Sequence, residues 1–462
     1  GAWDILVIAF GAMIGWGWVV STGTWIQDGG VLGAAIGFLI GGVMIFFVGL
    51  TYAELTSAMP QCGGEHVFSH RAMGPIGSFI CTWAIVLGYA SVVCFEACAL
   101  PTIVTYIFPD FLQGYLYTVA GFKVYASWLA VAIGMSILMT YINIRGIKAA
   151  AKLQTILTVI IGAAGILLVI VSAITGSVST LEPQAFIPGD TTTTFKAVLA
   201  VAVTTPFYFI GFDVIPQAAE EINVPLKKIG KILILSVVCA VLFYALVIIA
   251  VGLVLTDSEI IAAESGTGLV TADAMAKALS SATMAKVIII GGMCGIVTSW
   301  NSFLMGGSRA LYSMAESYMV PRFFAKLHPK YKTPINALYL IGFLSIIAPL
   351  AGRKMLVWIV DAGNFGCCLA YCMVALYAIP NSGSTLVWQE WCMAGGWGLL
   401  GVIFAVACKR KYQERFGTLA LIISDEDAAA LQSSDEEISV ALDRAIDDAI
   451  NKILAERRLT TA

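Results

Sequence analysis

An apolar run near the start of the chain contains residues 11–18, which read GAMIGWGW from Gly11 to Trp18. A second apolar run, in the other half of the chain, contains residues 206–213 with the sequence PFYFIGFD. Glycine and proline weaken helices, because glycine is conformationally free and proline removes a backbone donor. Interrupted hydrophobic segments at matching places in two halves of a chain are typical of the substrate site of a secondary transporter. We therefore expect both helices to unwind at a shared binding site.

The composition indicates an integral membrane protein. Of the 462 residues, 59% are hydrophobic and 12% are charged, and the mean hydropathy is +0.89. One soluble core cannot bury so much apolar surface. The apolar runs repeat at about 20 residues, the length that a helix needs to cross a bilayer. The net charge of −3 says little about partners; we expect a small-molecule substrate and the lipid bilayer, and no nucleic acid.

Hydropathy predicts ten membrane spans, in two sets of five within residues 1–174 and 195–378. They lie near residues 4–26, 31–59, 76–107, 125–144, 152–174, 197–217, 231–255, 285–315, 335–351 and 354–378. With a cytoplasmic N-terminus, the inner loops carry Arg71, Arg145, Lys148, Lys152, Lys227, Lys228, Lys231, Arg322, Lys326, Lys330 and Lys332. The outer loops carry Lys123, Lys196, Lys277, Lys286, Arg353 and Lys354. The excess of basic residues inside supports this orientation, in the cell membrane and with both termini cytoplasmic.

The region after residue 378 does not fit this topology. Only one more apolar run, about 391–408, lies in the segment 379–411, and crossing there would leave the basic cluster 409–411 outside. The positive-inside rule argues against this. Either a helix has been lost or omitted between Tyr377 and Asn381, or residues 379–390 begin a re-entrant path, or the last run does not span the membrane; we expect the first. Residues 412–462 form an acidic tail whose apolar residues recur at helical spacing, which predicts an amphipathic cytosolic helix.

The first interrupted run offers five candidate substrate contacts: Ala12, Met13, Gly15, Trp16 and Gly17. The glycines place no side chain between the backbone and a ligand. Unwinding would free backbone N–H groups with the positive end of a half-helix behind them, which suits a carboxylate. Alternatively, small residues at a spacing of four only allow helices to pack closely. Trp16 is expected to narrow the cavity or to close one side of it.

The second interrupted run offers Phe207, Tyr208, Ile210, Gly211 and Asp213. Pro206 and Gly211 weaken the helix, so nearby carbonyls become free to accept a substrate ammonium. An ionisable residue at membrane depth suggests a function. Asp213 is therefore a candidate counter-ion or proton-linked gate, or else a buried acid bonded to nearby hydroxyls. Glu96 in the third span carries the same hypothesis, although nothing in the sequence places it near either break.

The chain resembles the amino acid–polyamine–organocation transporters over about residues 3–378. Residues 13–17 (MIGWG) match the glycine-rich signature of the first helix, although a small or hydroxyl residue is usual at Trp16. Residues 211–213 (GFD) resemble a Gly-Phe-Glu pattern of the sixth helix, with Asp213 replacing glutamate. Further matching motifs follow in the expected order at residues 52–55 (YAEL), 219–221 (AEE) and 308–309 (SR).

This resemblance implies an all-α membrane protein with a leucine-transporter-like fold. Two inverted five-helix repeats, with helices 1 and 6 broken, would be followed by C-terminal helices. The family usually has twelve helices, so an eleventh is expected to be missing here. The resemblance also implies alternating access, with the substrate carboxylate on the first break and its amino group on the second.

The coupling ion stays open between H⁺ and Na⁺. Proton-coupled relatives often carry a lysine in the fifth helix that stands in for sodium, but residues 153–174 contain no lysine. The hydroxyls of Thr298, Ser299 and Ser302 could supply oxygen ligands to sodium. Alternatively, they bond to their own helix.

The expected function is that of a permease for amino acids. Trp16, Phe207, Tyr208 and Trp300 suggest an aromatic cavity for a zwitterion without a second charge. A polyamine or aminoalcohol transporter, or an exchanger, is the alternative within the family, and a channel or receptor-like scaffold is the alternative outside it. No His-rich cluster, activated nucleophile or phosphate loop indicates an enzyme. The eleven cysteines lie mostly in apolar segments, so neither a metal nor a cofactor is expected.

Overall fold

The computed structural model describes residues 2–119, 122–221, 224–352, 363 and 365–371. In this part of the chain, six helices are long and apolar enough to cross a membrane. Most of the tenth predicted span (354–362, 364 and 372–378), the run 391–408, the proposed loss of a helix and the tail 412–462 lie outside the described residues.

The first predicted span is broken. Helix α1 (Ala2–Met13) is followed by an irregular segment, then by α2 (Gly17–Val20) and α3 (Thr22–Gly29). A helix of 12 residues extends only about 18 Å, roughly half of a membrane. The unwinding predicted at residues 11–18 therefore divides the span near its middle.

The next four spans are continuous helices with bounds close to those predicted: α4 (Val31–Ala58), α5 (Glu65–Ile107), α6 (Ala126–Ile144) and α7 (Ile147–Thr175). Helix α5 begins eleven residues before the predicted start at residue 76. Gly74 has φ +70°, just before Pro75, and bends α5 there. The non-helical backbone of Gly74 (φ +70°, ψ −171°) separates two helical segments of α5, so a helix begins at Pro75, close to the predicted start, and is preceded by a further helical segment from Glu65.

The second half repeats the pattern of one broken span followed by long helices. Helix α9 (Thr191–Tyr208) is interrupted before the short α10 (Val214–Gln217), and α11 (Leu226–Val254) and α14 (Ala282–Glu316) follow. The polar stretch between α11 and α14 contains α12 (Asp257–Ser265) and α13 (Val270–Ala278). Helix α15 (Ile335–Ile347) continues into η5 (Ala348–Ala351).

The connections contain the elements that hydropathy did not predict. Strands β1 (Tyr115–Val119) and β2 (Phe122–Tyr125) form an antiparallel hairpin between α5 and α6. The side chain of Val124 is fully buried in a small cluster with Trp128. Shorter turns are α8 (Val178–Leu181), η1 (Pro109–Phe111), η2 (Glu182–Gln184), η3 (Ala219–Glu221) and η4 (Arg322–Ala325).

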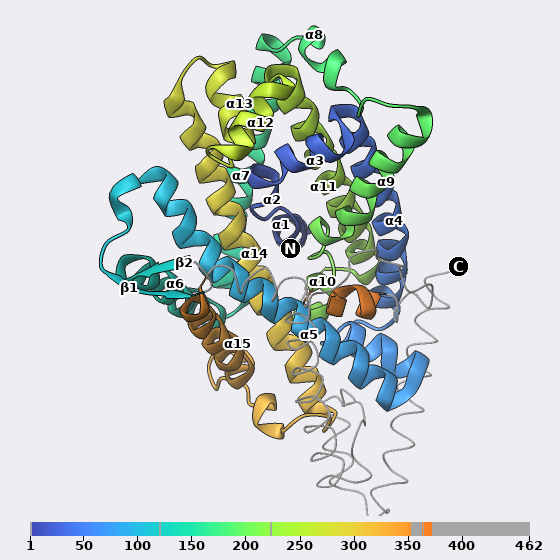
Figure 1. Cartoon of the computed structure of the whole chain (residues 1–462). Helices are drawn as coiled ribbons and strands as arrows, with labels where there is room; N and C mark the ends of the chain where they lie inside the picture. The colour runs from blue at the N-terminus through green and yellow to red at the C-terminus, as the bar shows by residue number, and fades with distance from the viewer. Residues whose placement is uncertain (1, 120–121, 222–223, 353–362, 364, 372–462) are drawn as a thin grey trace, which may run out of the picture. The chain divides into compact units, whose positions relative to one another are not determined.

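Helix α1 is the centre of the packing. It contacts α7, α11 and α14, while α4 packs on α9 and α11, and α5 packs along α14. Figure 1 shows α1 enclosed by these elements, with α10 next to it. The first broken span therefore lies inside the bundle, whereas α9 of the second packs on α4 and exposes Phe195 and Val203 on its other side.

Candidate substrate site at two broken helices

The first break leaves backbone donors without partners. Ile14 donates its N–H to Phe10 O at 3.0 Å, and regular bonding resumes when Val19 donates to Trp16 O at 3.0 Å. Between them, the N–H groups of Gly15, Trp16 and Gly17 make no backbone hydrogen bond to any described residue. Because α2 has only four residues, its dipole adds little, and the N–H groups themselves are the feature of this segment that suits an anion.

The second break exposes carbonyls at the end of a longer helix. Phe209 donates to Pro206 O at 3.2 Å and Ile210 to Phe207 O at 3.3 Å. The Phe207 carbonyl, expected to be free, thus already accepts one bond. The carbonyls of Tyr208, Phe209 and Ile210 follow it at the C-terminal end of the 18-residue α9, which is the negative end of the helix dipole. This end suits a cation.

The two breaks are in direct contact. Gly211 has φ +130°, and a Cβ placed there would lie 2.7 Å from Ala12 Cβ and 3.0 Å from Met13 N. A Cβ on Gly17 would lie 2.8 Å from the Tyr208 ring. Both glycines are therefore required for the close approach of the two breaks.

Helix α14 closes the site from a third side. A Cβ on Gly295 would collide with the carbonyl of Gly15 and lie 2.8 Å from Ile14 O. One turn earlier, Gly292 lies against the ring of Trp16, which is 7% exposed. Trp16 therefore forms a wall between α1 and α14, as predicted from its size.

Asp213 is fully buried next to the second break. Its Oδ1 accepts the N–H of Gly211 at 2.9 Å, and its Oδ2 accepts the hydroxyl of Tyr89 from α5. Among the described residues, neither Lys nor Arg forms an ion pair with Asp213. The carboxyl is thus held only by neutral donors and is a candidate for exchange with a proton or a cation.

Glu96 is brought to the first break, which the sequence could not show. It lies two turns after Tyr89 on α5, so both side chains are on one face of that helix. A Cβ on Gly15 would lie 3.5 Å from Glu96 Oε1 and 3.8 Å from Ser299 Oγ. Glu96 is 3% exposed, and its Oε2 has no hydrogen-bond partner in the described part of the chain. One face of α5 therefore supplies a carboxyl, Glu96, to the first break and a hydroxyl, that of Tyr89, to Asp213 at the second break.

Trp300 does not lie with the other candidates. It is fully buried on α14, but it follows Ser299 by one residue and so lies about 100° around the helix from it. The face of α14 toward α1 carries Gly295 and Ser299 instead. The role of Trp300 as a substrate contact therefore stays a prediction, because aromatic character alone does not specify a helix face.

The three hydroxyl residues of the possible sodium site make different contacts. Thr298 Oγ1 donates to Gly295 O at 2.9 Å, one turn earlier on its own helix. Ser302 Oγ donates to Ile8 O of α1 at 3.3 Å, and Ser299 lies beside Gly15. Thr298 thus bonds to its own helix, which was the alternative to binding an ion. Ser302 instead connects α14 to α1.

Gln154 on α7 is the functional candidate that sequence reasoning missed. Its Nε2 donates to Ser302 Oγ at 3.0 Å and to Val7 O at 3.4 Å. Its Oε1 accepts the Asn301 amide at 2.9 Å, and the side chain is fully buried. A neutral amide thus donates to the oxygens that could otherwise bind a cation between α1 and α14. The only available signal was a glutamine in an apolar span.

An aromatic cluster packs beside the first break and also escaped sequence analysis. The Trp25 ring lies 4.4 Å from Phe38 and 4.7 Å from Tyr208 between centroids, and Tyr244 lies 5.1 Å from Phe38. The hydroxyl of Tyr244 donates to Met13 O at 2.9 Å. This bond occupies one carbonyl at the end of α1 and fixes the position of the break.

Two broken helices that meet at their breaks, with buried acids beside them, define a multi-pass membrane transporter. Residues 4–382 match the family model described as amino acid permease. The chain belongs to this family, and it is a transporter and not an enzyme. Members of the family have the leucine-transporter-like fold, which confirms the predicted fold class.

Several curated proteins are similar over most of their length. The branched-chain amino acid permease BcaP of Bacillus subtilis is 29% identical, over 75% of this chain and 73% of its own. The methylthioribose transporter of the same organism is 29% identical over 82% and 80%. The lysine-specific permease LysP of Escherichia coli is 24% identical over 80% and 76%. These relatives are thus named for branched-chain amino acids, methylthioribose and lysine.

Proposed function

We propose that the chain moves amino acids across the cell membrane by alternating access around the two breaks. The substrate carboxylate binds the N–H groups of Gly15, Trp16 and Gly17. Its amino group binds the carbonyls of Tyr208, Phe209 and Ile210. The contact of the two breaks at Gly211 and Ala12 carries this proposal, because it brings a segment with free N–H groups next to the carbonyl end of α9 in a water-poor interior. Family membership supports a transporter over the channel or scaffold alternatives.

The two breaks do not specify the side chain of the substrate. Glu96 favours a second candidate substrate class. A buried carboxylate oxygen without a partner is costly unless it binds a cation or a proton. Glu96 Oε2 is such an atom beside the first break. We propose that a lysine-like amino acid or a polyamine would pair with Glu96, whereas a branched-chain amino acid would require Glu96 to be protonated. The similarity to LysP supports the first reading and that to BcaP the second.

Uptake into proteoliposomes separates these candidates. Labelled leucine, lysine and putrescine would each be offered to the wild type and to Glu96→Gln, with and without unlabelled substrate inside the vesicles. If Glu96 pairs with a substrate cation, the variant is expected to lose about tenfold or more of lysine or putrescine uptake and to keep leucine uptake. Transport of none of the three by the wild type would contradict the proposed function.

The site also bears on coupling. We propose that sodium does not bind between α1 and α14, because Gln154 already donates to Ser302 Oγ and Val7 O. A sodium ion there would have to displace the amide. Proton coupling through Asp213 or Glu96, or exchange of substrates, then drives transport.

Two measurements test this account of coupling. Replacing sodium by choline in the uptake buffer is expected to leave wild-type uptake unchanged. Gln154→Leu is expected to lower uptake by about tenfold, because it removes the bonds from Gln154 to Ser302 Oγ, Val7 O and the Asn301 amide, each worth about 0.5–1.5 kcal/mol, although Thr158 still donates to Val7 O and Asn301 still donates to Ala150 O. Thr155→Ala is the matched control, since Thr155 bonds only to Ala151 O of its own helix. Clear stimulation of the wild type by sodium would contradict the proposal.

A further inference from the structure

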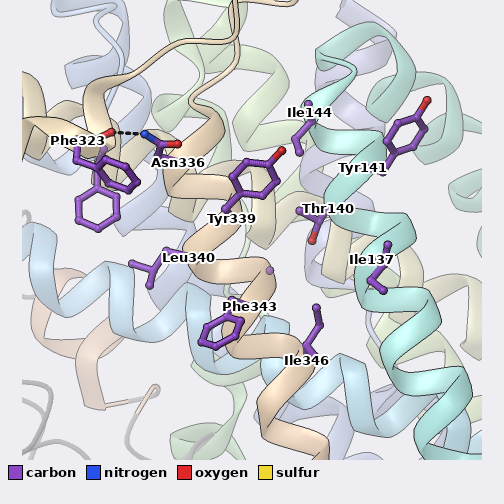
Figure 2. Close-up of a pocket in the computed structure, with 12 residues that line it drawn as sticks. Ile137, Thr140, Tyr141, Ile144, Phe323, Asn336, Tyr339, Leu340, Phe343 and Ile346 are labelled. Atoms are coloured by element: carbon purple, nitrogen blue, oxygen red, sulfur yellow. Dashed lines mark hydrogen bonds between the residues drawn. The ribbon is translucent and has the colours of Figure 1, made fainter.

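A groove of about 690 Å³ lies between α6 and α15, away from both breaks. Residues Ile137, Thr140, Tyr141 and Ile144 line it from one face of α6, and Asn336, Tyr339, Phe343 and Ile346 line it from α15. Figure 2 shows these side chains along the two helices, with Phe323 at one end. Phe343 is 57% exposed and Ile137 55%. The lining is mostly apolar and faces outward from membrane helices.

The floor of the groove is formed by close packing. A Cβ on Gly342 would collide with the hydroxyl of Thr140, so α15 approaches α6 closely at this point. Ser136 Oγ donates to Ser345 O across the same contact at 3.1 Å. The helices therefore touch at the floor, while their larger side chains form the sides.

The length of the groove matches one leaflet of a bilayer. Asn336 and Ile346 are ten residues apart on α15, which corresponds to about 15 Å along the helix. The hydrocarbon core of a bilayer is about 30 Å thick. In Figure 2 the hydroxyl ends of Tyr141 and Tyr339 point toward the end where Ile144 and Asn336 lie. Tyrosine hydroxyls are enriched at the level of the lipid headgroups.

That same end is strongly basic. Arg145 directly follows the lining residue Ile144; its Nη1 donates to Tyr141 OH at 2.7 Å, and its Cζ lies 5.6 Å from the Tyr331 ring. Lys330 Nζ lies 5.5 Å from the centroid of the same Tyr331 ring. The sequence contains neither Asp nor Glu in residues 126–181 or 317–360. Among the described residues, neither Arg145 nor Lys330 forms an ion pair, so the mouth of the groove carries positive charge.

We propose that the groove binds an anionic phospholipid, with one acyl chain between α6 and α15 and its phosphate at Arg145. The guanidinium can donate two parallel hydrogen bonds to a phosphate. Anionic lipids are enriched in the cytoplasmic leaflet, the side on which the positive-inside rule places these basic loops. A symmetric contact between two copies of the chain would instead bring the two basic mouths together, which is unfavourable.

Native mass spectrometry of the full-length, delipidated protein tests the proposal. Phosphatidylglycerol and phosphatidylcholine with identical acyl chains would be added in equal amounts. The wild type is expected to retain one phosphatidylglycerol molecule in preference. Arg145→Ala should reduce that preference about fivefold, whereas Ile137→Trp, which fills the groove, should reduce retention of both lipids.

Matched controls keep each result specific. Lys231→Ala removes an exposed basic residue of α11, which does not line the groove, and Ile166→Trp adds the same ring at a 59% exposed position of α7. Both are expected to bind lipid as the wild type does. Equal retention of the two lipids by the wild type, or unchanged retention in both groove variants, would overturn the proposal. A dimer that disappears only in Ile137→Trp would assign the groove to a second copy instead.

Discussion

Gly211→Ala is expected to abolish transport. Gly211 has φ +130°, and its missing Cβ would lie 2.7 Å from Ala12 Cβ and 2.9 Å from Ala12 C. Alanine would thus be strained in its own backbone and would push the two breaks apart. Strain and overpacking each cost about 1–3 kcal/mol, and 1.4 kcal/mol is about tenfold in an equilibrium. Uptake per folded molecule should therefore fall by roughly 100-fold or more.

The control for this prediction is Gly134→Ala. Gly134 lies on α6, and a Cβ there would meet no atom within 4 Å. The same chemical change should leave uptake at the wild-type level. Size-exclusion chromatography and thermal unfolding of both variants would show how much folded protein each sample contains. Wild-type uptake by Gly211→Ala would mean that the breaks can separate without loss of the site.

Asp213→Asn is expected to reduce uptake by at least about tenfold and to flatten its dependence on pH. Asparagine has nearly the same shape and can still accept the Tyr89 hydroxyl, so the fold should persist. The change removes the negative charge and the charge-assisted bond from Gly211 N–H, and such bonds are worth about 1.5–3 kcal/mol. Uptake would be measured from mildly acidic to mildly alkaline pH.

Tyr89→Phe separates the charge of Asp213 from its positioning. The ring of Tyr89 packs against Gly306 and Gly307 of α14 and lies 5.5 Å from Phe303. Phenylalanine keeps this packing and removes only the hydroxyl, so a smaller loss of uptake with the pH dependence retained is expected. If Asp213→Asn transports at the wild-type rate at every pH, Asp213 has no part in the mechanism.

Most of the membrane helices follow from hydropathy, because a span must satisfy its own backbone and expose apolar side chains to lipid. The interruptions in the first and sixth spans follow from glycine and proline. The short elements do not follow in the same way. The hairpin between α5 and α6 depends on burying Val124 against Trp128, and the helical segment from Glu65 to the break at Gly74 lies before the predicted start of the third span.

The sequence by itself determined the membrane location, the family and the two places where helices unwind, because composition, motifs and local backbone chemistry carry these properties. Only the tertiary structure decided which side chains reach the breaks. Glu96 meets Gly15, and Gln154 meets Val7 and Ser302, whereas Trp300 lies on another face of α14. Such contacts join residues that are far apart in the chain, and the packing of whole helices sets them, so no local spacing can encode them.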